Sequence, residues 1–159
     1  MPSAIRFKKS PSKNILIIHG PNLNLLGKRE PNLYGTTTLK SINDRIQKAA
    51  KQKCYKTLFY QSNIEGRIVS KIQQSFKKVS GILINPAAYT HTSVAIRDAL
   101  LTAHLPTVEV HLTNIHQREP FRKHSLISDI VNGQVIGFGV KSYELGLSAL
   151  IQTIERSLE

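Results

Sequence analysis

Five short apolar runs alternate along the chain with segments whose apolar residues recur at helical spacing. The runs are bounded by turn-forming residues, as buried parallel strands are, and cover Ile15–His19, Thr57–Gln61, Gly81–Asn85, Thr107–His111 and Val135–Val140. Helical stripes are formed by Leu39, Ile42 and Ile46, by Ile68, Ile72 and Phe76, and by Leu147, Leu150, Ile151, Ile154 and Leu158. Five βα units with no break in composition predict a single doubly wound α/β domain with a five-stranded parallel sheet.

The chain can form this domain without further support. Residues 1–13 are polar and basic and lack the apolar centre of a secretory signal, so we expect a flexible tail before one folded domain over residues 14–159. A chain of 159 residues can bury a self-sufficient core, and none of its apolar runs approaches membrane-spanning length. Ser62, with Glu65 three residues later, has capping-box spacing, which places the start of the second helix just after Gln61.

The net charge of +12 raises nucleic acid as a partner. The lysines, however, are spread along predicted helix faces with few aromatic residues between them, which favours a solvated basic surface. We therefore expect no nucleic-acid partner and no membrane partner, although a positive field can draw in a small carboxylate substrate. The single Cys54 has no metal or redox spacing, so we expect a buried or half-buried free thiol and a cytoplasmic location.

Polar residues gather where three predicted strands end, in the segments 22–34, 85–98 and 111–122. Ligands of open parallel sheets bind at the carboxyl ends of the strands, so these segments predict one shared site. The first segment carries Arg29 five residues before Tyr34, with glycines at its margins that let a lid move. A guanidinium close to a phenol favours the phenolate, which can act as a base.

The fourth predicted strand places Glu109 and His111 two residues apart, so both side chains project from one face. A carboxylate fixes the tautomer of a neighbouring imidazole and suits it to general-acid chemistry, but the two groups can equally just satisfy each other. Arg118 and Arg122 follow, four residues apart in a predicted helical turn. Either arginine can bind a substrate anion, and a plain surface position is an equal alternative for Arg118.

Three polar residues follow the third predicted strand. Pro86 ends that strand at Asn85, whose amide can donate to a nearby oxyanion or can cap an Asx turn. His91 precedes the next helix in a segment rich in threonine and serine that suits hydroxyl or anion recognition. Asp98, seven residues on, is a candidate for the same site or a solvated helix carboxylate.

Several familiar chemistries lack their sequence markers. The chain has no glycine-rich phosphate loop and no nucleophile elbow. His19, His104, His116 and His124 form no metal-ligand spacing, so we expect no metal and no cofactor, and we interpret His19 as a satisfied histidine at the core edge. Two classes stay open at this point: an enzyme acting on a small polyhydroxy acid, and a basic α/β binding module that engages nucleic acid without catalysis.

Three longer blocks stand in order along the chain. The first is GPNLNLLG at residues 20–27 with REP at 29–31 and YG at 34–35, and the second is NPAAYTHTS at 85–93 with RDA at 97–99. The third is EVHLTN at 109–114, followed by Arg118, Glu119 and Arg122. Together these blocks resemble the type II 3-dehydroquinate dehydratases, and the resemblance extends from residue 14 to about residue 150.

The resemblance implies a flavodoxin-like fold and the third step of the shikimate pathway. In that step water is eliminated in the anti sense from 3-dehydroquinate, through an enolate and without cofactor or metal, to give 3-dehydroshikimate. It implies that Tyr34 removes the C2 proton, that Arg29 lowers the pKa of Tyr34, and that Asn85 stabilises the enolate oxygen through a water. It also implies that His111, oriented by Glu109, protonates the departing C1 hydroxyl.

The substrate-binding residues that the resemblance implies are Asn22, Asn85, His91, Asp98, Leu112, Thr113 and Arg122. Backbone N–H groups of Leu112 and Thr113 are expected to bind the substrate carboxylate, while His91 and Arg122 contact ring hydroxyls. The family forms dodecamers built from trimers, so Asp98 is expected to complete the site of a neighbouring subunit. Ile64 and Arg67 stand where many members have a histidine and an acidic residue.

Overall fold

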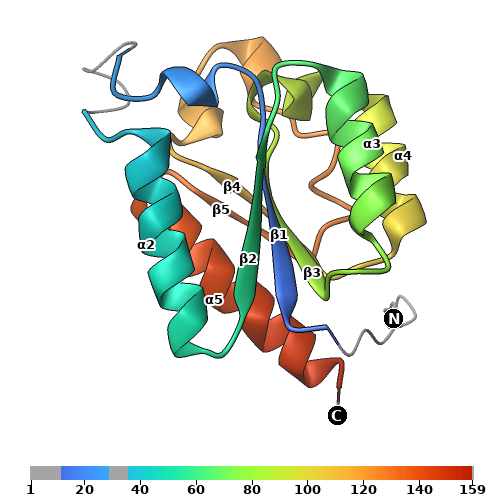
Figure 1. The fold of residues 1–159 in the computed structure, drawn as a ribbon. Helices are drawn as coiled ribbons and strands as arrows, with labels where there is room; N and C mark the ends of the chain where they lie inside the picture. Colours follow the sequence, from blue (N-terminus) through green and yellow to red (C-terminus); the bar gives the residue numbers. More distant parts are fainter. Residues whose placement is uncertain (1–11, 29–35, 159) are drawn as a thin grey trace.

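The computed structural model describes residues 12–28 and 36–158, with a five-stranded parallel sheet at its centre (Figure 1). The strands are β1 (Asn14–His19), β2 (Lys56–Gln61), β3 (Gly81–Asn85), β4 (Thr107–His111) and β5 (Gly133–Ile136). Their order across the sheet is β2-β1-β3-β4-β5, and every pairing is parallel. The winding direction reverses between β1 and β3, and such a reversal opens a ligand crevice at the carboxyl ends of the two strands.

Helices cover both faces of this sheet. Helices α2 (Leu39–Gln52) and α5 (Lys141–Arg156) lie on one face, and α3 (Glu65–Ser75) and α4 (Val94–Ala103) lie on the other (Figure 1). This single, doubly wound α/β domain confirms the fold predicted from the alternating apolar pattern. Within the described ranges, no helix is long and apolar enough to cross a membrane.

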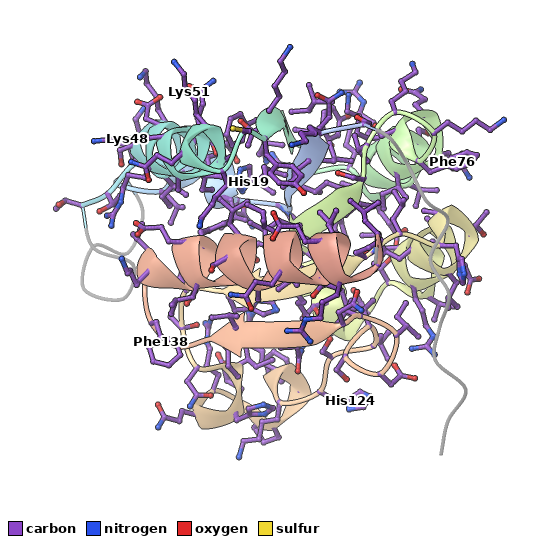
Figure 2. The ribbon with its side chains drawn as sticks, turned by 90° about the horizontal axis from the view of Figure 1, so that it is seen from below. His19, Lys48, Lys51, Phe76, His124 and Phe138 are labelled. Atoms are coloured by element: carbon purple, nitrogen blue, oxygen red, sulfur yellow. The ribbon has the colours of Figure 1, made fainter. Side chains whose placement is uncertain are left out.

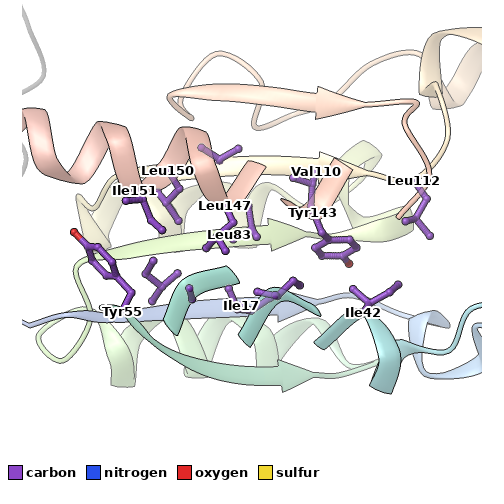
Figure 3. Packing of buried hydrophobic residues seen from close by; sticks show 14 of the residues in the cluster. Ile17, Ile42, Tyr55, Leu83, Val110, Leu112, Tyr143, Leu147, Leu150 and Ile151 are labelled. Carbon is purple, nitrogen blue, oxygen red and sulfur yellow. The ribbon is translucent and has the colours of Figure 1, made fainter. Parts of the chain in front are cut away.

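Two apolar cores result from this layering. In β1, Ile15 and Ile17 face α2 and α5, whereas Leu16 and Ile18 face α3 and α4. Because both faces are covered, the central strands are continuous apolar runs instead of alternating ones. Figure 3 shows the first core, in which Leu147, Leu150 and Ile151 of α5 lie over the sheet.

Short 3-10 turns build the carboxyl edge, namely η1 (Leu23–Leu25), η2 (Ala87–His91), η3 (Ile115–Gln117) and η4 (Pro120–Arg122). The prediction of a single helical turn around Arg118 and Arg122 is wrong, because two separate turns, η3 and η4, are present there. Arg118 follows η3 and has extended backbone angles, so it separates the two turns. Pro120 then starts η4, because its fixed φ angle suits the first position of a helical turn.

The predicted bounds of β5 and the predicted start of α3 differ from those in the structure. Strand β5 spans Gly133–Ile136 and not Val135–Val140. It ends early because Gly137 and Gly139 have positive φ angles that turn the chain into α5. Helix α3 starts at Glu65, because the Ser62 hydroxyl accepts a hydrogen bond from the Ile64 N–H (3.0 Å) in the turn before the helix.

Cys54 is exposed, which corrects the expectation of a buried or half-buried thiol. It follows α2 with a left-handed φ of 60°, and its N–H donates to the Lys51 carbonyl oxygen (3.0 Å). A left-handed residue of this kind ends the helix and turns the chain. The thiol environment therefore depends on the helix end, which the apolar pattern does not reveal.

Gly146→Ala is expected to destabilise the protein, because α5 approaches the sheet closely at this residue. An added Cβ would lie 2.4 Å from Cγ1 of Val110 and 3.0 Å from Cδ1 of Leu83. Overpacking of this kind costs about 1–3 kcal/mol, which urea unfolding measures directly. Gly66→Ala in α3, where a Cβ meets nothing within 4 Å, is the matched control and should be neutral or stabilising. Equal unfolding midpoints for the two variants would contradict this account of the packing.

Candidate active site

A pocket of about 240 Å³ opens at the carboxyl edge of the sheet, where the loops after β1, β3 and β4 meet. The predicted site residues that line it are Asn22, Asn85, His91, His111, Leu112, Thr113 and Arg122. The apolar part of the pocket wall is formed by Leu23, Leu25, Leu26 and Ile115. Its charged part includes Arg118 and Glu119. The predicted convergence of three loops on one site is therefore observed.

Other predicted residues lie elsewhere. Glu109 is completely buried behind His111 and is not part of the pocket lining. Asp98 is exposed on α4, outside the pocket of its own chain. Arg29 and Tyr34 lie outside the described residues, so their placement remains a prediction.

Asn85 lies at the point where β3 turns into the pocket. Its Oδ1 accepts the N–H of Ala87 (3.0 Å), and Ala87 itself has a positive φ of 53°. The Gly20 N–H donates to the Asn85 carbonyl oxygen (2.7 Å), and a Cβ at Gly20 would lie only 2.2 Å from the Pro86 carbonyl oxygen. The Asx turn predicted as one alternative is thus present. It uses only the amide oxygen, and the amide nitrogen of Asn85 remains a donor.

Glu109 and His111 form a direct contact, as their spacing predicts. The Nε2 of His111 donates to Oε1 of Glu109 at 2.7 Å, and His111 is only 6% exposed. Because a carboxylate accepts this bond, Nε2 carries a proton. Nδ1 is then the ring nitrogen that can serve the pocket.

Three further donors surround the Glu109 carboxylate, and sequence reasoning missed all of them. The Thr90 hydroxyl donates to Oε1, while Ser125 Oγ (2.9 Å) and Gln134 Nε2 (2.6 Å) donate to Oε2. Burial by itself raises the pKa of Glu109, but the hydrogen bonds and the charge of His111 outweigh it and the pKa lies below its ordinary value. Glu109 is therefore ionised at neutral pH.

His91 presents a different histidine chemistry to the same pocket. Its Nδ1 lies 2.7 Å from the His124 carbonyl oxygen, which only accepts, so Nδ1 carries the proton. Burial lowers the pKa of His91, and this outweighs the opposing effect of the hydrogen bond to His124. The ring is therefore neutral, and Nε2 is an acceptor for a ligand hydroxyl.

His19 is satisfied inside the protein, as the sequence interpretation expected. It lies between α2 and α5 (Figure 2), where Nε2 donates to Asn43 Oδ1 and Nδ1 accepts from the Tyr143 hydroxyl, each at 2.8 Å. Burial lowers the pKa of His19 to about 4, against the opposing effect of the hydrogen bond that His19 donates to Asn43. The Tyr143 hydroxyl also interacts with Asn85, so this buried network reaches the pocket wall.

The arginine side of the pocket is positively charged. Nε of Arg122 lies 3.2 Å and Nε of Arg118 lies 3.6 Å from Oε2 of Glu119. Two guanidinium groups with one carboxylate leave a net positive wall, which favours an anionic ligand. None of the lysines that the structure describes lines the pocket, and Lys48 and Lys51 extend from the outer side of α2 into solvent (Figure 2).

The described part of the chain contains no group of three or more histidine, cysteine or acidic side chains placed to hold a metal ion. The groups that do meet are an imidazole bonded to a buried carboxylate, a neutral imidazole, an amide donor and two guanidiniums. These groups suit proton transfer on a hydroxylated anion. Fold and site together define an acid–base enzyme on a flavodoxin-like α/β scaffold.

Comparison with known proteins specifies this class further. The family model described as dehydroquinase class II matches residues 13–151. A protein of Acaryochloris marina named 3-dehydroquinate dehydratase is 56% identical over 142 residues, which cover 89% of this chain and 95% of the relative. One of Haemophilus influenzae with the same name is 54% identical over 135 residues, covering 85% and 91%.

Solved structures agree with the sequence relatives. The type II dehydroquinase of Butyrivibrio crossotus superimposes with a TM-score of 0.85 and 44% identity, covering 88% of this chain and 98% of that one. The enzyme of Propionibacterium acnes gives a TM-score of 0.84 with 41% identity, covering 90% and 99%. The chain belongs to the class II dehydroquinase family.

His19 is expected to make the stability of the fold depend on pH. Its pKa is 6.5 in the unfolded chain and about 4 in the folded protein. Between these values the unfolded state binds a proton that the folded state does not bind. The free energy of unfolding therefore falls as the pH drops from 6.5 toward 4, with a slope of at most about 1.4 kcal/mol per pH unit from this group.

Urea unfolding across this pH window measures the slope. His19→Gln removes the titrating group and should flatten the slope, even if the variant is less stable at neutral pH. His91, whose pKa is also lowered, contributes with the same sign, so the slope decreases without vanishing. The exposed His116→Gln is the matched control. An unchanged slope in His19→Gln would show that another group causes the acid sensitivity.

Proposed function

We propose that this chain catalyses the elimination of water from 3-dehydroquinate to give 3-dehydroshikimate, the hydro-lyase step of the shikimate pathway. The observation that carries the proposal is the buried Glu109–His111 pair at a pocket that also contains Asn85 and His91. Membership of the class II dehydroquinase family supports the same reaction. Its anti elimination needs a base, a stabiliser for the enolate and an acid.

Tyr34 is the base in this proposal. As a phenolate it takes the C2 proton, and the electron pair of the C–H bond moves into the ketone to form an enolate. Arg29, five residues earlier in the sequence, is the proposed partner that supplies a positive charge to the phenolate at any working pH. In the sequence both residues follow the pocket residues Leu25 and Leu26 within nine positions.

Asn85 stabilises the enolate. Its Oδ1 is occupied by the Ala87 N–H and its side chain also bonds the Tyr143 hydroxyl, so the amide has one remaining N–H to offer toward the pocket. An ordered water bonded to that group can donate in turn to the enolate oxygen. A single preorganised donor of this kind is worth about 3 kcal/mol in comparable oxyanion sites.

His111 is the acid. In the imidazolium form Nε2–H donates to Glu109 and Nδ1–H faces the pocket, where it can protonate the C1 hydroxyl. The enolate then collapses, the C1–O bond breaks and water leaves. The neutral ring that remains keeps its proton on Nε2, which is the tautomer that the ionised Glu109 already requires. The acid therefore needs no reorientation after proton transfer.

The remaining pocket residues bind the substrate in this proposal. Backbone N–H groups of Leu112 and Thr113, at the carboxyl end of β4, hold the carboxylate that the positive arginine wall attracts. Nε2 of His91 accepts a ring hydroxyl, and Arg122 and Asn22 contact further oxygens of the substrate. Neither cofactor nor metal takes part.

The proposal extends to assembly and location. Asp98 is exposed on α4, away from its own pocket, so its contribution is to the site of a neighbouring subunit. The assembly proposed is a dodecamer of four trimers, located in the cytoplasm. A chain without Asp98 should then lose activity although its own pocket is intact.

Tyr34→Phe is expected to abolish turnover while binding of a substrate analogue stays nearly intact, because only the proton-accepting oxygen is lost. Turnover is followed by the ultraviolet absorbance of the conjugated product, and analogue binding by calorimetry. Tyr60→Phe is the matched control, since Tyr60 lies on β2 beside Lys71 (5.3 Å) and outside the pocket. Comparable activity in Tyr34→Phe would rule out this base.

His111→Ala is expected to lower kcat by roughly 100-fold or more with little effect on KM, because general-acid assistance acts in the transition state. Steady-state kinetics with 3-dehydroquinate separates the two constants. An effect confined to KM would assign His111 to binding instead.

The binding-module alternative makes the opposite prediction for the native chain. It requires salt-sensitive association with DNA or RNA and no absorbance change with 3-dehydroquinate. That pair of results would overturn the proposed function.

A further inference from the structure

The segment 124–129 crosses behind the pocket and contacts both of its histidine systems. His91 Nδ1 donates to the His124 carbonyl oxygen (2.7 Å), and the Leu126 N–H donates to the Thr90 carbonyl oxygen (2.8 Å). Ser125, between these two contacts, donates to Glu109 (2.9 Å). One short segment therefore touches the neutral histidine and the carboxylate that orients the other histidine.

Helix α4 fixes this segment from outside. Arg97 donates to the Leu126 carbonyl oxygen (2.6 Å) and forms a two-point pair with Asp129, in which Nη2 lies 2.9 Å from Oδ2. Two-point guanidinium–carboxylate pairs define direction as well as distance. The backbone at residues 124–126 is thus fastened independently of the groups in the pocket.

The Ser125 hydroxyl contacts both the Glu109 carboxylate and the Thr90 hydroxyl, whose oxygen lies 3.0 Å away. The Ser125 oxygen accepts the Ile127 N–H (3.2 Å), and its single proton goes to the carboxylate, because an ionised carboxylate is a stronger acceptor than a hydroxyl. Thr90 and His111 donate to Oε1 and Gln134 donates to Oε2, while Ser125 Oγ lies 2.9 Å from Oε2 and 3.1 Å from Oε1. With donors on both oxygens, the carboxylate plane is held in one orientation.

We propose that Ser125 is a positioning residue that fixes the plane of the Glu109 carboxylate and thereby aims the Nδ1 atom of His111 at the leaving hydroxyl. The proposal rests on the proposed function only for the identity of that hydroxyl. The same segment, 124–129, sets the tautomer of His91, so it positions both the acid His111 and the hydroxyl acceptor His91. Arg97 holds this segment in place.

Ser125→Ala is expected to lower kcat by roughly 10- to 100-fold, the range for one lost hydrogen bond to a charged group, with KM within about twofold. Ser80→Ala is the matched control. Both serines are 5% exposed and both hydroxyls donate, but Ser80 donates to Asn14 at the opposite end of the sheet. Ser80→Ala should therefore leave kcat and KM unchanged.

The pH dependence of kcat is a readout that a general loss of stability does not change. With one donor lost, the Glu109 carboxylate is less stabilised, so the acid limb of kcat should shift to higher pH in Ser125→Ala. The other ionisable groups near this carboxylate are His111 on β4 and His91 on η2, and Arg122 on η4 acts on His91 in turn. All three are retained in the variant.

Two further variants test whether the segment 124–129 positions both histidines. In a Glu109→Gln background, Ser125→Ala should add little, because the two residues act as a unit. Arg97→Gln loosens the whole segment and should change both kcat and KM, since His91 loses its fixed tautomer as well. A kcat for Ser125→Ala equal to that of Ser80→Ala, or independent effects of Ser125→Ala and Glu109→Gln, would overturn the proposal.

Nitrogen NMR of the histidine rings separates this inference from the proposed function. Ser125→Ala should shift the Nε2 signal of His111, whether or not the native chain turns over 3-dehydroquinate. An unchanged signal would overturn the positioning role even in an active enzyme. A shifted signal in a native chain without dehydratase activity would keep the positioning role and overturn only the reaction.

Discussion

The buried carboxylate of Glu109 is the constraint on which the carboxyl edge of this fold depends. Removing an isolated carboxylate from water costs several kcal/mol, so it remains charged only where donors replace the lost water. Those donors come from β4, from η2, from the segment after η4 and from β5. Loops that are distant in sequence must therefore meet at one carboxylate.

The parallel sheet divides the chemistry between its two faces. Asn85 follows Leu83 on the side of α2 and α5, whereas Glu109 and His111 alternate with Val108 and Val110 and project to the side of α3 and α4. The amide of Asn85 and the imidazole of His111 can meet only beyond the strand ends, where the backbone no longer separates the two faces. This explains why the pocket lies at the edge and why the close approach of Gly20 to Pro86 is needed there.

Local patterns predicted the parts of this structure that depend on neighbouring residues. Period-two alternation placed Glu109 and His111 on one face, and Pro86 correctly ended β3 at Asn85. Thr90, Ser125 and Gln134 could not be found in this way, because their contact with Glu109 arises from packing between distant segments. The environment of Cys54 was missed for a related reason, since a left-handed helix end decides it.

The three buried or half-buried histidines show how the partner, and not the residue type, decides the chemistry. His19 faces an amide oxygen and a phenol in an apolar core, so burial keeps it neutral. His91 donates to a carbonyl oxygen, which fixes a tautomer without supplying a full negative charge. Only His111 donates to an ionised carboxylate, which fixes the ring tautomer required by the acid role proposed for it. Exchanging these partners would exchange the roles, even though every histidine stayed in place.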